Sequence, residues 1–556
     1  MKIFFICFVL FLFSTKSSSQ VVEEWVSRFN GVSNSQDEPT AMAVDNSGNV
    51  YITGRSIGVG SIVNPWDIVT IKYDSNGVEI WTAIFGMDGR QEEANDIKVD
   101  NDGNVYITGY AVDDLLHSDF LTIKYDSNGD TVWVRRYNGP ANANGVGKAI
   151  EVDTISGRVF VTGSSQGFLT VNDVNYVTIA YEPNGELIWA SSYDGPGNST
   201  DIPLAMTFRP GEVLVTGSSR TTTLSQSDDY LTIKYSAATG DTLWTRRYDG
   251  SGFFDEPQSI AIDQAGNVYI TGFSSSGSFP TDRDYLTIKY STEGNEIWVA
   301  DYNNTSTDEA YSVAVDIQGN VFVTGMSNGF GADFATVKYN SSGVEQWVKR
   351  YHGGAPFSSN FDVAKAITVD EMSNVYVTGT SVLGLSSNDA DIFTIKYSSD
   401  GDSLWTASYN GPGDGGDAAI NITLDNFGNI YVTGTSIGIG TSSDYTLIKY
   451  KQTTITGLDD NTGNIPIAYN LSNNYPNPFN PSTKIKYTVP AGAFRQLVSI
   501  KVFNLLGSLV SVLVNENKEA GEYEVEFNST NLPSGVYFYT FQAGSFIKTK
   551  KMVLLK

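Results

Sequence analysis

Three short motifs recur eight times along the chain at a nearly constant interval. A [Val/Ile]-Thr-Gly triplet returns every 53 to 55 residues, with its threonine at Thr53, Thr108, Thr162, Thr216, Thr271, Thr324, Thr378 and Thr433. A Thr-Ile-Lys-Tyr sequence or a variant of it, and a tryptophan followed four residues later by Phe or Tyr, keep the same period. A fixed period of this length is typical of repeat architectures, so we expect one structural unit in eight copies.

Each unit contains four short segments with the composition of β-strands. In the second copy they cover residues 97–99, 105–108, 120–125 and 131–137, and Asn/Asp/Gly clusters at 100–104 and 126–130 supply tight turns. Four antiparallel strands repeated radially predict an all-β fold, a β-propeller. The helical solenoids are excluded, because no unit has an apolar pattern at helical spacing.

The phase of the repeat predicts how the ring closes. Residues 25–31 (WVSRFNG) match residues 133–139 (WVRRYNG), which form the fourth strand of a unit, whereas no tryptophan follows the last unit after Tyr450. We therefore expect the N-terminal strand to complete the last of eight four-stranded antiparallel blades. Such closure leaves neither terminal blade with an exposed edge.

These units resemble a family of bacterial propeller repeats that is often described as seven-bladed. The resemblance covers roughly residues 22–450, and its signature Asp-x-x-Gly-Asn-Val-Tyr-[Val/Ile]-Thr-Gly stands at 45–54, 100–109 and 263–272. It implies an extracellular repeat scaffold with no defined activity. The count of eight departs from the nominal blade number of the family.

The N-terminus has the pattern of a signal peptide. Lys2 is followed by an apolar run over residues 3–13, and Ser17 to Ser19 supply small residues for cleavage before Gln20. The run is too short to cross a bilayer, and we expect no transmembrane segment elsewhere. The single cysteine, Cys7, leaves with the signal, so we expect no disulfide or thiol chemistry in the mature chain.

Charge separates two further regions. Residues 473–556 hold nine basic and five acidic residues, whereas residues 20–472 have a formal charge of −33. This acidic balance argues against nucleic acid as a partner. We expect a propeller over 20–450, a linker over 451–472 and a separate domain over 473–556.

The last region resembles the C-terminal sorting domain that the type IX secretion system reads in Bacteroidetes and related bacteria. The resemblance rests on YPNPFNPST (475–483), KVFNLLGSLV (501–510), LPSGVYFYTF (532–541) and KTKKMVLLK (548–556). It implies a small, Ig-like β-sandwich, the type IX machinery as partner, and a secreted or cell-surface location with later cleavage or anchoring. The alternative is an ordinary Ig-like module that acts as a spacer.

A carboxylate recurs eight residues before the aspartate that ends the first strand. The positions are Asp37, Glu92, Asp201, Asp255, Asp308, Asp362 and Asp417, with Gly145 in the remaining copy. One interpretation is a ring of oxygen ligands for Ca²⁺ at the mouth of the tunnel, and it would be the only cofactor. The other is turn chemistry, in which each carboxylate accepts backbone N–H groups, and repetition in nearly every blade favours it. A second set, which includes Asp229 and Asp333, opens the third strand and has the same two interpretations.

The connections between the second and third strands, and between the fourth strand and the next unit, differ most between copies. Variable loops on a rigid scaffold often bind ligands. Aromatic residues that interrupt the repeat there are candidates for stacking on sugar rings or for contact with a protein partner, against the alternative of local loop packing. They are Trp66, Phe253, Phe254, Phe279, Phe330, Phe357 and Phe361.

Three classes of function remain. The first, which we favour, is a non-catalytic binding or adhesion scaffold for a glycan or a surface protein. The second is an enzyme that acts on extracellular polysaccharides or resembles the quinoproteins; the Asp-x-x-Gly-x-x-x-Trp unit (Asp126, Gly129, Trp133) is similar to the docking units of eight-bladed quinoprotein dehydrogenases. Those enzymes commonly use a disulfide that this chain lacks, and His117 and His352 have no evident catalytic companion. The third is a structural surface-layer protein.

Overall fold

The computed structural model of the chain describes residues 19–556 except 33, 59–65, 87–88, 140, 168–172, 197, 222–227, 251–253, 276–281, 305, 330, 354–360, 383–389, 455–469, 490–495, 519–520 and 544–545. These residues form strands and no helix, so the fold class is all-β, as the repeat pattern predicts. Within the same described part of the chain, no helix long and apolar enough to span a membrane is found.

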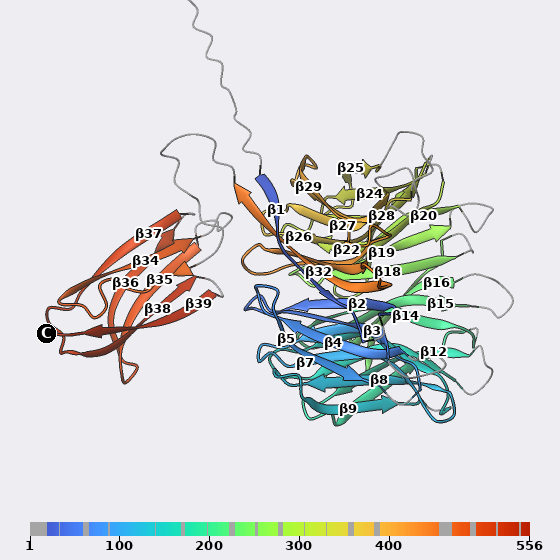
Figure 1. The fold of residues 1–556 in the computed structure, drawn as a ribbon, viewed down its shortest axis with the longest axis horizontal. Helices are drawn as coiled ribbons and strands as arrows, with labels where there is room; N and C mark the ends of the chain where they lie inside the picture. Colours follow the sequence, from blue (N-terminus) through green and yellow to red (C-terminus); the bar gives the residue numbers. More distant parts are fainter. Residues whose placement is uncertain are drawn as a thin grey trace, which may run out of the picture.

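Eight four-stranded antiparallel sheets form the blades of a propeller (Figure 1). We call the strands of a blade a, b, c and d from the axis outward. The a strands are β2 (Asp37–Val44), β6 (Glu92–Val99), β10 (Gly145–Val152), β14 (Asp201–Arg209), β18 (Asp255–Ile262), β22 (Asp308–Val315), β26 (Val363–Val369) and β30 (Ala418–Leu424). The b strands are β3 (Val50–Ile57), β7 (Val105–Val112), β11 (Val159–Gln166), β15 (Glu212–Arg220), β19 (Val268–Ser275), β23 (Val321–Asn328), β27 (Val375–Val382) and β31 (Ile430–Ile437).

The outer half of each blade is equally regular. The c strands are β4 (Trp66–Tyr73), β8 (Ser118–Tyr125), β12 (Val174–Tyr181), β16 (Asp228–Ser236), β20 (Arg283–Tyr290), β24 (Ala332–Tyr339), β28 (Ala390–Tyr397) and β32 (Ser443–Thr454). The d strands are β5 (Glu79–Phe85), β9 (Thr131–Tyr137), β13 (Leu187–Tyr193), β17 (Thr242–Tyr248), β21 (Glu296–Tyr302), β25 (Glu345–Tyr351), β29 (Ser403–Tyr409) and β1 (Ser19–Phe29). We number the blades 1 to 8 from β2, so that blade 8 contains β30, β31, β32 and β1.

The ring closes through the N-terminal strand. β1 pairs antiparallel with β32, with Val26 opposite Ile448, and lies beside it in Figure 1 although the two are far apart in the sequence. The a strands of successive blades pack against one another, and β30 of the last blade packs against β2 of the first. The predicted eight-bladed propeller with four-stranded blades and this closure is confirmed.

The short a–b turns follow from the Asp-x-x-Gly-Asn sequence. In blade 1, Oδ1 of Asp45 accepts the backbone N–H groups of Ser47 (2.8 Å) and Asn49 (2.9 Å), and Gly48 takes a φ of 79° that favours glycine. The other oxygen of Asp45 accepts the hydroxyl of the buried Tyr51 at 3.0 Å. One aspartate thus fixes the turn and satisfies a polar group in the core of the blade.

A tryptophan on strand d joins each blade to the next. In blade 2, Nε1 of Trp133 donates to the carbonyl of Pro183 in the c–d turn of blade 3, and a Cβ added at Gly185 would lie 2.9 Å from the indole. Seven tryptophans donate in this way at 3.0–3.2 Å, namely Trp25, Trp81, Trp133, Trp189, Trp244, Trp298 and Trp347. Each docking buries a large aromatic surface between blades, which explains why the tryptophan recurs.

The junction between blades 7 and 8 differs, because strands c and d of blade 8 are β32 and β1, which come from opposite ends of the propeller sequence and are not joined by a turn. Trp405 is buried, and its Nε1 has no hydrogen-bond acceptor among the described residues. Lys396 donates to Oε1 of Gln452 (2.6 Å), and Gln452 donates to the hydroxyl of Tyr376 (2.9 Å). A side chain of the extended β32 therefore contacts blade 7 at the place where the other junctions have a turn.

The C-terminal residues form a β-sandwich, as predicted. One sheet has the order β33 (Asn470–Leu471), β34 (Ser482–Val489), β37 (Gly521–Asn528). The other has the order β36 (Leu509–Lys518), β35 (Gln496–Asn504), β38 (Gly535–Ala543), β39 (Phe546–Leu554). A single apolar core that includes Ile485, Ile500 and Phe541 joins them. The predicted domain boundaries remain predictions, and the predicted signal peptide lies outside the described residues apart from Ser19.

Candidate functional site

The predicted ring of carboxylates lies at the start of the inner strands, on the rim that carries the b–c and d–a connections. Asp37, Glu92, Asp201, Asp255, Asp308, Asp362 and Asp417 are all at most 1% exposed. The six aspartates each accept a backbone N–H from the d–a turn before them, as Asp255 does from Gly250 at 2.7 Å and Asp362 from Gly353 at 2.8 Å. Gly145 starts the inner strand of blade 3.

Burial makes ionisation of these carboxyl groups costly. It raises the pKa of Asp37, Asp201, Asp308 and Asp417, and raises that of Asp255 to about 6. The backbone N–H donors oppose this effect. The ring is therefore a set of buried, turn-fixing carboxylates whose charge is only partly compensated by the protein.

The carboxylates that open strand c lie at the same junctions, and those of the even-numbered blades pair with an arginine of the neighbouring strand d. The arginines stand three residues after the docking tryptophan in the even-numbered blades, and odd-numbered blades have Ile84, Ser192, Asp301 or Ser408 there. The ion pairs are Arg28–Asp444 (2.8 Å), Arg136–Asp119 (2.9 Å), Arg247–Asp229 (2.7 Å) and Arg350–Asp333 (2.6 Å). Sequence reasoning missed this alternation, although its signal was the spacing from the tryptophan.

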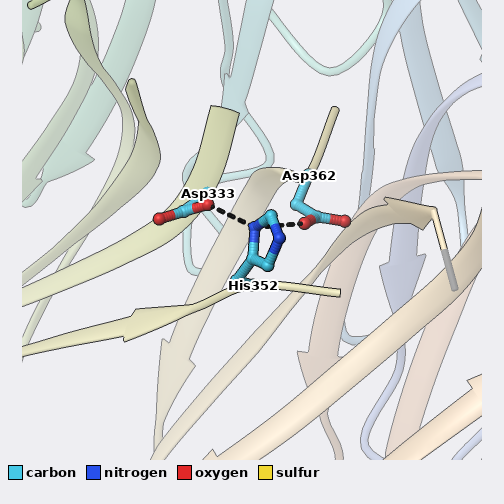
Figure 2. Close-up of side chains that lie close together, drawn as sticks. All are labelled: Asp333, His352 and Asp362. Atoms are coloured by element: carbon cyan, nitrogen blue, oxygen red, sulfur yellow. Dashed lines mark hydrogen bonds and ion pairs between the residues drawn. The ribbon is translucent and has the colours of Figure 1, made fainter. Parts of the chain in front are cut away.

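In the part of the chain that the structure describes, two junctions bring three ligand-type side chains together. Between blades 6 and 7, the side chains of Asp333, His352 and Asp362 converge, and Figure 2 shows the imidazole between the two carboxylates. Between blades 4 and 5, the side chains of Asp229, Asp249 and Asp255 occupy the corresponding positions. In each case one ligand atom per residue lies within 4.8 Å of the others. Asp362 and Asp255 belong to the predicted ring, whereas His352 and Asp249 were not predicted as ligands.

His352 follows strand β25 and faces both carboxylates through one ring nitrogen. Its Nδ1 lies 2.8 Å from Oδ1 of Asp333 and 3.7 Å from Oδ2 of Asp362 (Figure 2). Arg350 contacts the other oxygen of Asp333 through Nη2 (2.6 Å) and Nε (3.2 Å). Oδ1 of Asp362 accepts the N–H of Val382 at 2.9 Å. Both carboxylates are therefore oriented by fixed donors before any ligand arrives.

The structure describes three of the seven predicted aromatic residues. Phe361 precedes Asp362, forms a parallel bridge with Ala332 and is 60% exposed, so it lies beside the His352 cluster on the same rim. Phe254 precedes Asp255 at the equivalent junction and is only partly exposed. Trp66 begins β4, and the guanidinium of Arg55 lies 4.4 Å from the centre of its ring. Phe253, Phe279, Phe330 and Phe357 lie outside the described residues.

The second histidine makes a purely local contact. His117 follows a turn in which Asp113 accepts its backbone N–H at 2.8 Å, and the imidazole Nδ1 is 3.7 Å from the same carboxylate. No cluster of three ligand-type side chains includes it in the described part of the chain. Among the described residues of the loop rim, the junction between blades 6 and 7 thus combines two carboxylates, a guanidinium and an imidazole, from Asp333, Asp362, Arg350 and His352, and Phe361 directly precedes Asp362.

The fold defines the class of this protein: an eight-bladed β-propeller that shares its chain with a small β-sandwich. Residues 24–60, 243–280 and 297–331 match the family described as Beta-propeller repeat. Residues 473–555 match the Secretion system C-terminal sorting domain. Both resemblances inferred from the sequence are thus confirmed. The protein carries a type IX sorting domain, so it is a secreted propeller protein directed to the cell surface or outer membrane.

Similarity to individual proteins is low. A WD repeat-containing protein of Acanthamoeba polyphaga mimivirus is 24% identical over 468 residues, which cover 72% of this chain and 29% of that protein. PorZ, a surface component of the type IX secretion system of Porphyromonas gingivalis, is 13% identical at a TM-score of 0.35 and covers 93% of this chain and 74% of its own. The propeller domain of the Trilobed protease of Pyrococcus furiosus is 9% identical at a TM-score of 0.36, and the match covers 66% of this chain and 97% of the protease domain.

Proposed function

We propose that the exported propeller is a non-catalytic binding scaffold whose ligand, a glycan or a surface protein, docks on the b–c/d–a rim beside blades 6 and 7. The observation that carries the proposal is that the exposed residue Phe361 directly precedes Asp362 and bridges Ala332 beside Asp333, so it adjoins the polar group of Asp333, His352 and Asp362 along the backbone. An apolar platform beside a few fixed polar groups is typical of ligand sites. A loop on a rigid scaffold is where such sites usually lie.

A carbohydrate fits this combination best. The face of an aromatic ring packs against the C–H face of a sugar, while carboxylate and imidazole groups bond the hydroxyls. His352 is 28% exposed, so it lies within reach of a surface ligand. Trp66 is the second candidate platform, but Arg55 covers one face of its ring, and the guanidinium also pairs with Glu93 at 2.6 Å.

The test is binding of the purified mature chain to an array of extracellular glycans. We expect binding that is lost in Phe361→Ala and weakened in Trp66→Ala. The matched control is Phe427→Ala, because Phe427 is comparably exposed (56%) but lies in an a–b turn on the opposite rim. Binding that all three variants retain would move the ligand away from this rim. Absence of any glycan binding would favour a protein ligand or the surface-layer alternative.

We further propose that residues 473–556 direct the propeller through the type IX machinery and are then cleaved or kept as an anchor. The sorting-domain match over 473–555 supports this route. Deletion of residues 473–556 should leave the protein in the periplasm of its native host. Surface exposure of the truncated protein, measured by protease accessibility on intact cells, would contradict the proposal.

A further inference from the structure

One of the eight blade junctions has an imidazole where the others have none. The residue after the last aromatic of strand d is His352 between blades 6 and 7. At the other junctions it is Asn30, Gly86, Asn138, Asp194, Asp249, Asn303 or Asn410. The backbone around these positions is repetitive, so the histidine changes the chemistry of one junction without a change of architecture. Divalent transition metals bind imidazole nitrogen well, whereas calcium and magnesium favour oxygen ligands.

The distances between the three side chains suit a metal ion. Nδ1 of His352 is 2.8 Å from Oδ1 of Asp333 and 3.7 Å from Oδ2 of Asp362. Ligands at about 2.0–2.2 Å from a zinc ion lie roughly 3.0–3.5 Å from one another, between the two observed values. The two distances from Nδ1 of His352 thus differ from this range by a few tenths of an ångström, and the ligand atoms of all three side chains lie within 4.8 Å of one another.

The carboxylates are held in place by groups that do not occupy the position between the ligand atoms. Arg350 contacts Oδ2 of Asp333 and leaves Oδ1 directed at His352. The backbone N–H groups of Gly353 and Val382 hold Asp362, which is fully buried. Outer partners of this kind orient ligands and tune affinity in metal sites. Without a metal, a proton lies in the contact between His352 and Asp333, and a bound ion would replace it.

We propose that Asp333, His352 and Asp362 bind one divalent transition-metal ion, of which zinc is the best match, at the junction between blades 6 and 7. Asp333 comes from β24 of blade 6 and Asp362 directly precedes β26 of blade 7, so the ion links two neighbouring blades. His352 is partly exposed, so solvent reaches this cluster. The proposal goes beyond the binding function, since it concerns a metal alone.

The experiment uses the full mature chain after treatment with a chelator. Zinc chloride alone is titrated by calorimetry, bound zinc is counted by mass spectrometry after dialysis, and thermal unfolding is followed with and without zinc. We expect one zinc ion per chain and a rise in melting temperature by mass action of about 2 °C or more. In His352→Asn, which has the residue found at four other junctions, affinity should fall by roughly tenfold or more.

Two controls separate this site from incidental binding. Asp249→Asn changes the equivalent position between blades 4 and 5, and His117→Ala removes the other histidine; both should bind zinc as the unchanged chain does. A cooperative melting transition shows that each variant is folded. Absence of stoichiometric zinc, or equal affinity in His352→Asn and the unchanged chain, would overturn the proposal. Glycan binding is measured separately, so either proposal can fail alone.

Discussion

The junction between blades 4 and 5 and the junction between blades 6 and 7 share the same arginine–aspartate pair and the same buried aspartate. They differ in the charge of the third side chain. In the first, Arg247 pairs with Asp229 at 2.7 Å and Asp255 accepts the N–H of Gly250. In the second, Arg350 pairs with Asp333 at 2.6 Å and Asp362 accepts the N–H of Gly353. The third residue is Asp249 in one and His352 in the other.

That single difference changes the electrostatic balance. Between blades 4 and 5 the carboxylates of Asp229, Asp249 and Asp255 lie close together, and Arg247 pairs with Asp229. Burial together with Asp229 and Asp249 raises the pKa of Asp255 to about 6. Between blades 6 and 7, an imidazole takes the place of the third carboxylate. The repeat thus keeps the geometry of the junction, while one variable turn residue sets its net charge.

Removal of the arginine should have the largest effect and should differ between the two junctions. Arg247→Ala leaves the carboxylate of Asp229, which is 1% exposed, beside two other carboxylates. We expect a loss of about 3 kcal/mol in the free energy of unfolding. Arg350→Ala should lose roughly half as much, because His352 still donates to Asp333. Urea denaturation of both variants measures the difference.

Equal losses in the two arginine variants would show that His352 does not stabilise the carboxylate of Asp333. Arg28→Ala is a useful third variant, because Arg28 pairs with Asp444 in blade 8 and the variable position of that blade is occupied by Asn30 and not by a histidine. It should fall between the other two. A larger loss for Arg350→Ala than for Arg247→Ala would show that the imidazole does not support Asp333.

The pH dependence of Asp255 is the second expected effect. Its pKa is raised in the folded chain from 3.8 to about 6, so its protonated form favours the fold. The stabilisation is complete below pH 3.8 and is lost as the pH rises through 6. Asp255→Asn keeps an oxygen for Gly250 and removes the charge. The melting temperature of the variant should therefore rise relative to that of the unchanged chain above pH 6, by an amount that corresponds to about 3 kcal/mol in the free energy of unfolding.

The quantity to follow is the difference in melting temperature between Asp255→Asn and the unchanged chain across the pH range, because the other carboxylates titrate in both proteins. A constant difference between pH 4 and pH 8 would mean that Asp255 has an ordinary pKa. Asp249→Asn should reproduce part of the gain, since the Asp249 charge contributes to the shift of Asp255.

Periodicity predicted most of the fold and little of the site. The phase of the tryptophans placed β1 in the last blade, because strand order in a repeated sheet follows from spacing alone. The buried carboxylates were also found by spacing. The cluster of Asp333, His352 and Asp362 was not, since its members come from two blades and meet only when the ring curvature brings a c strand next to the following a strand. The candidate aromatic residues stand in loops of unequal length, which periodicity cannot align.

Replacement of Asp249 by histidine should give the junction between blades 4 and 5 the zinc-binding set of the junction between blades 6 and 7. Its effect on stability should be smaller than those of the substitutions described above. Asp249→His removes one of three carboxylates and places an imidazole beside Asp229 and Asp255. We expect a gain of about 1 kcal/mol in the free energy of unfolding at neutral pH, and a second zinc ion per chain. Calorimetric titration with zinc chloride measures the stoichiometry. A variant that still binds one ion, or that is destabilised, would show that the two junctions are not equivalent.

The smallest effect on stability is expected for the aromatic residue that precedes the inner carboxylate. Phe361 is 60% exposed, so Phe361→Ala should change the free energy of unfolding by no more than about 0.5 kcal/mol. Phe254 stands in the same position between blades 4 and 5 but is only partly exposed, and Phe254→Ala should cost roughly 1 kcal/mol. Ligand binding should show the opposite order, with the loss confined to Phe361→Ala. If Phe361→Ala destabilised the chain as much as Phe254→Ala, the ring would be a packing residue and the rim beside blade 7 would lose its platform for a ligand.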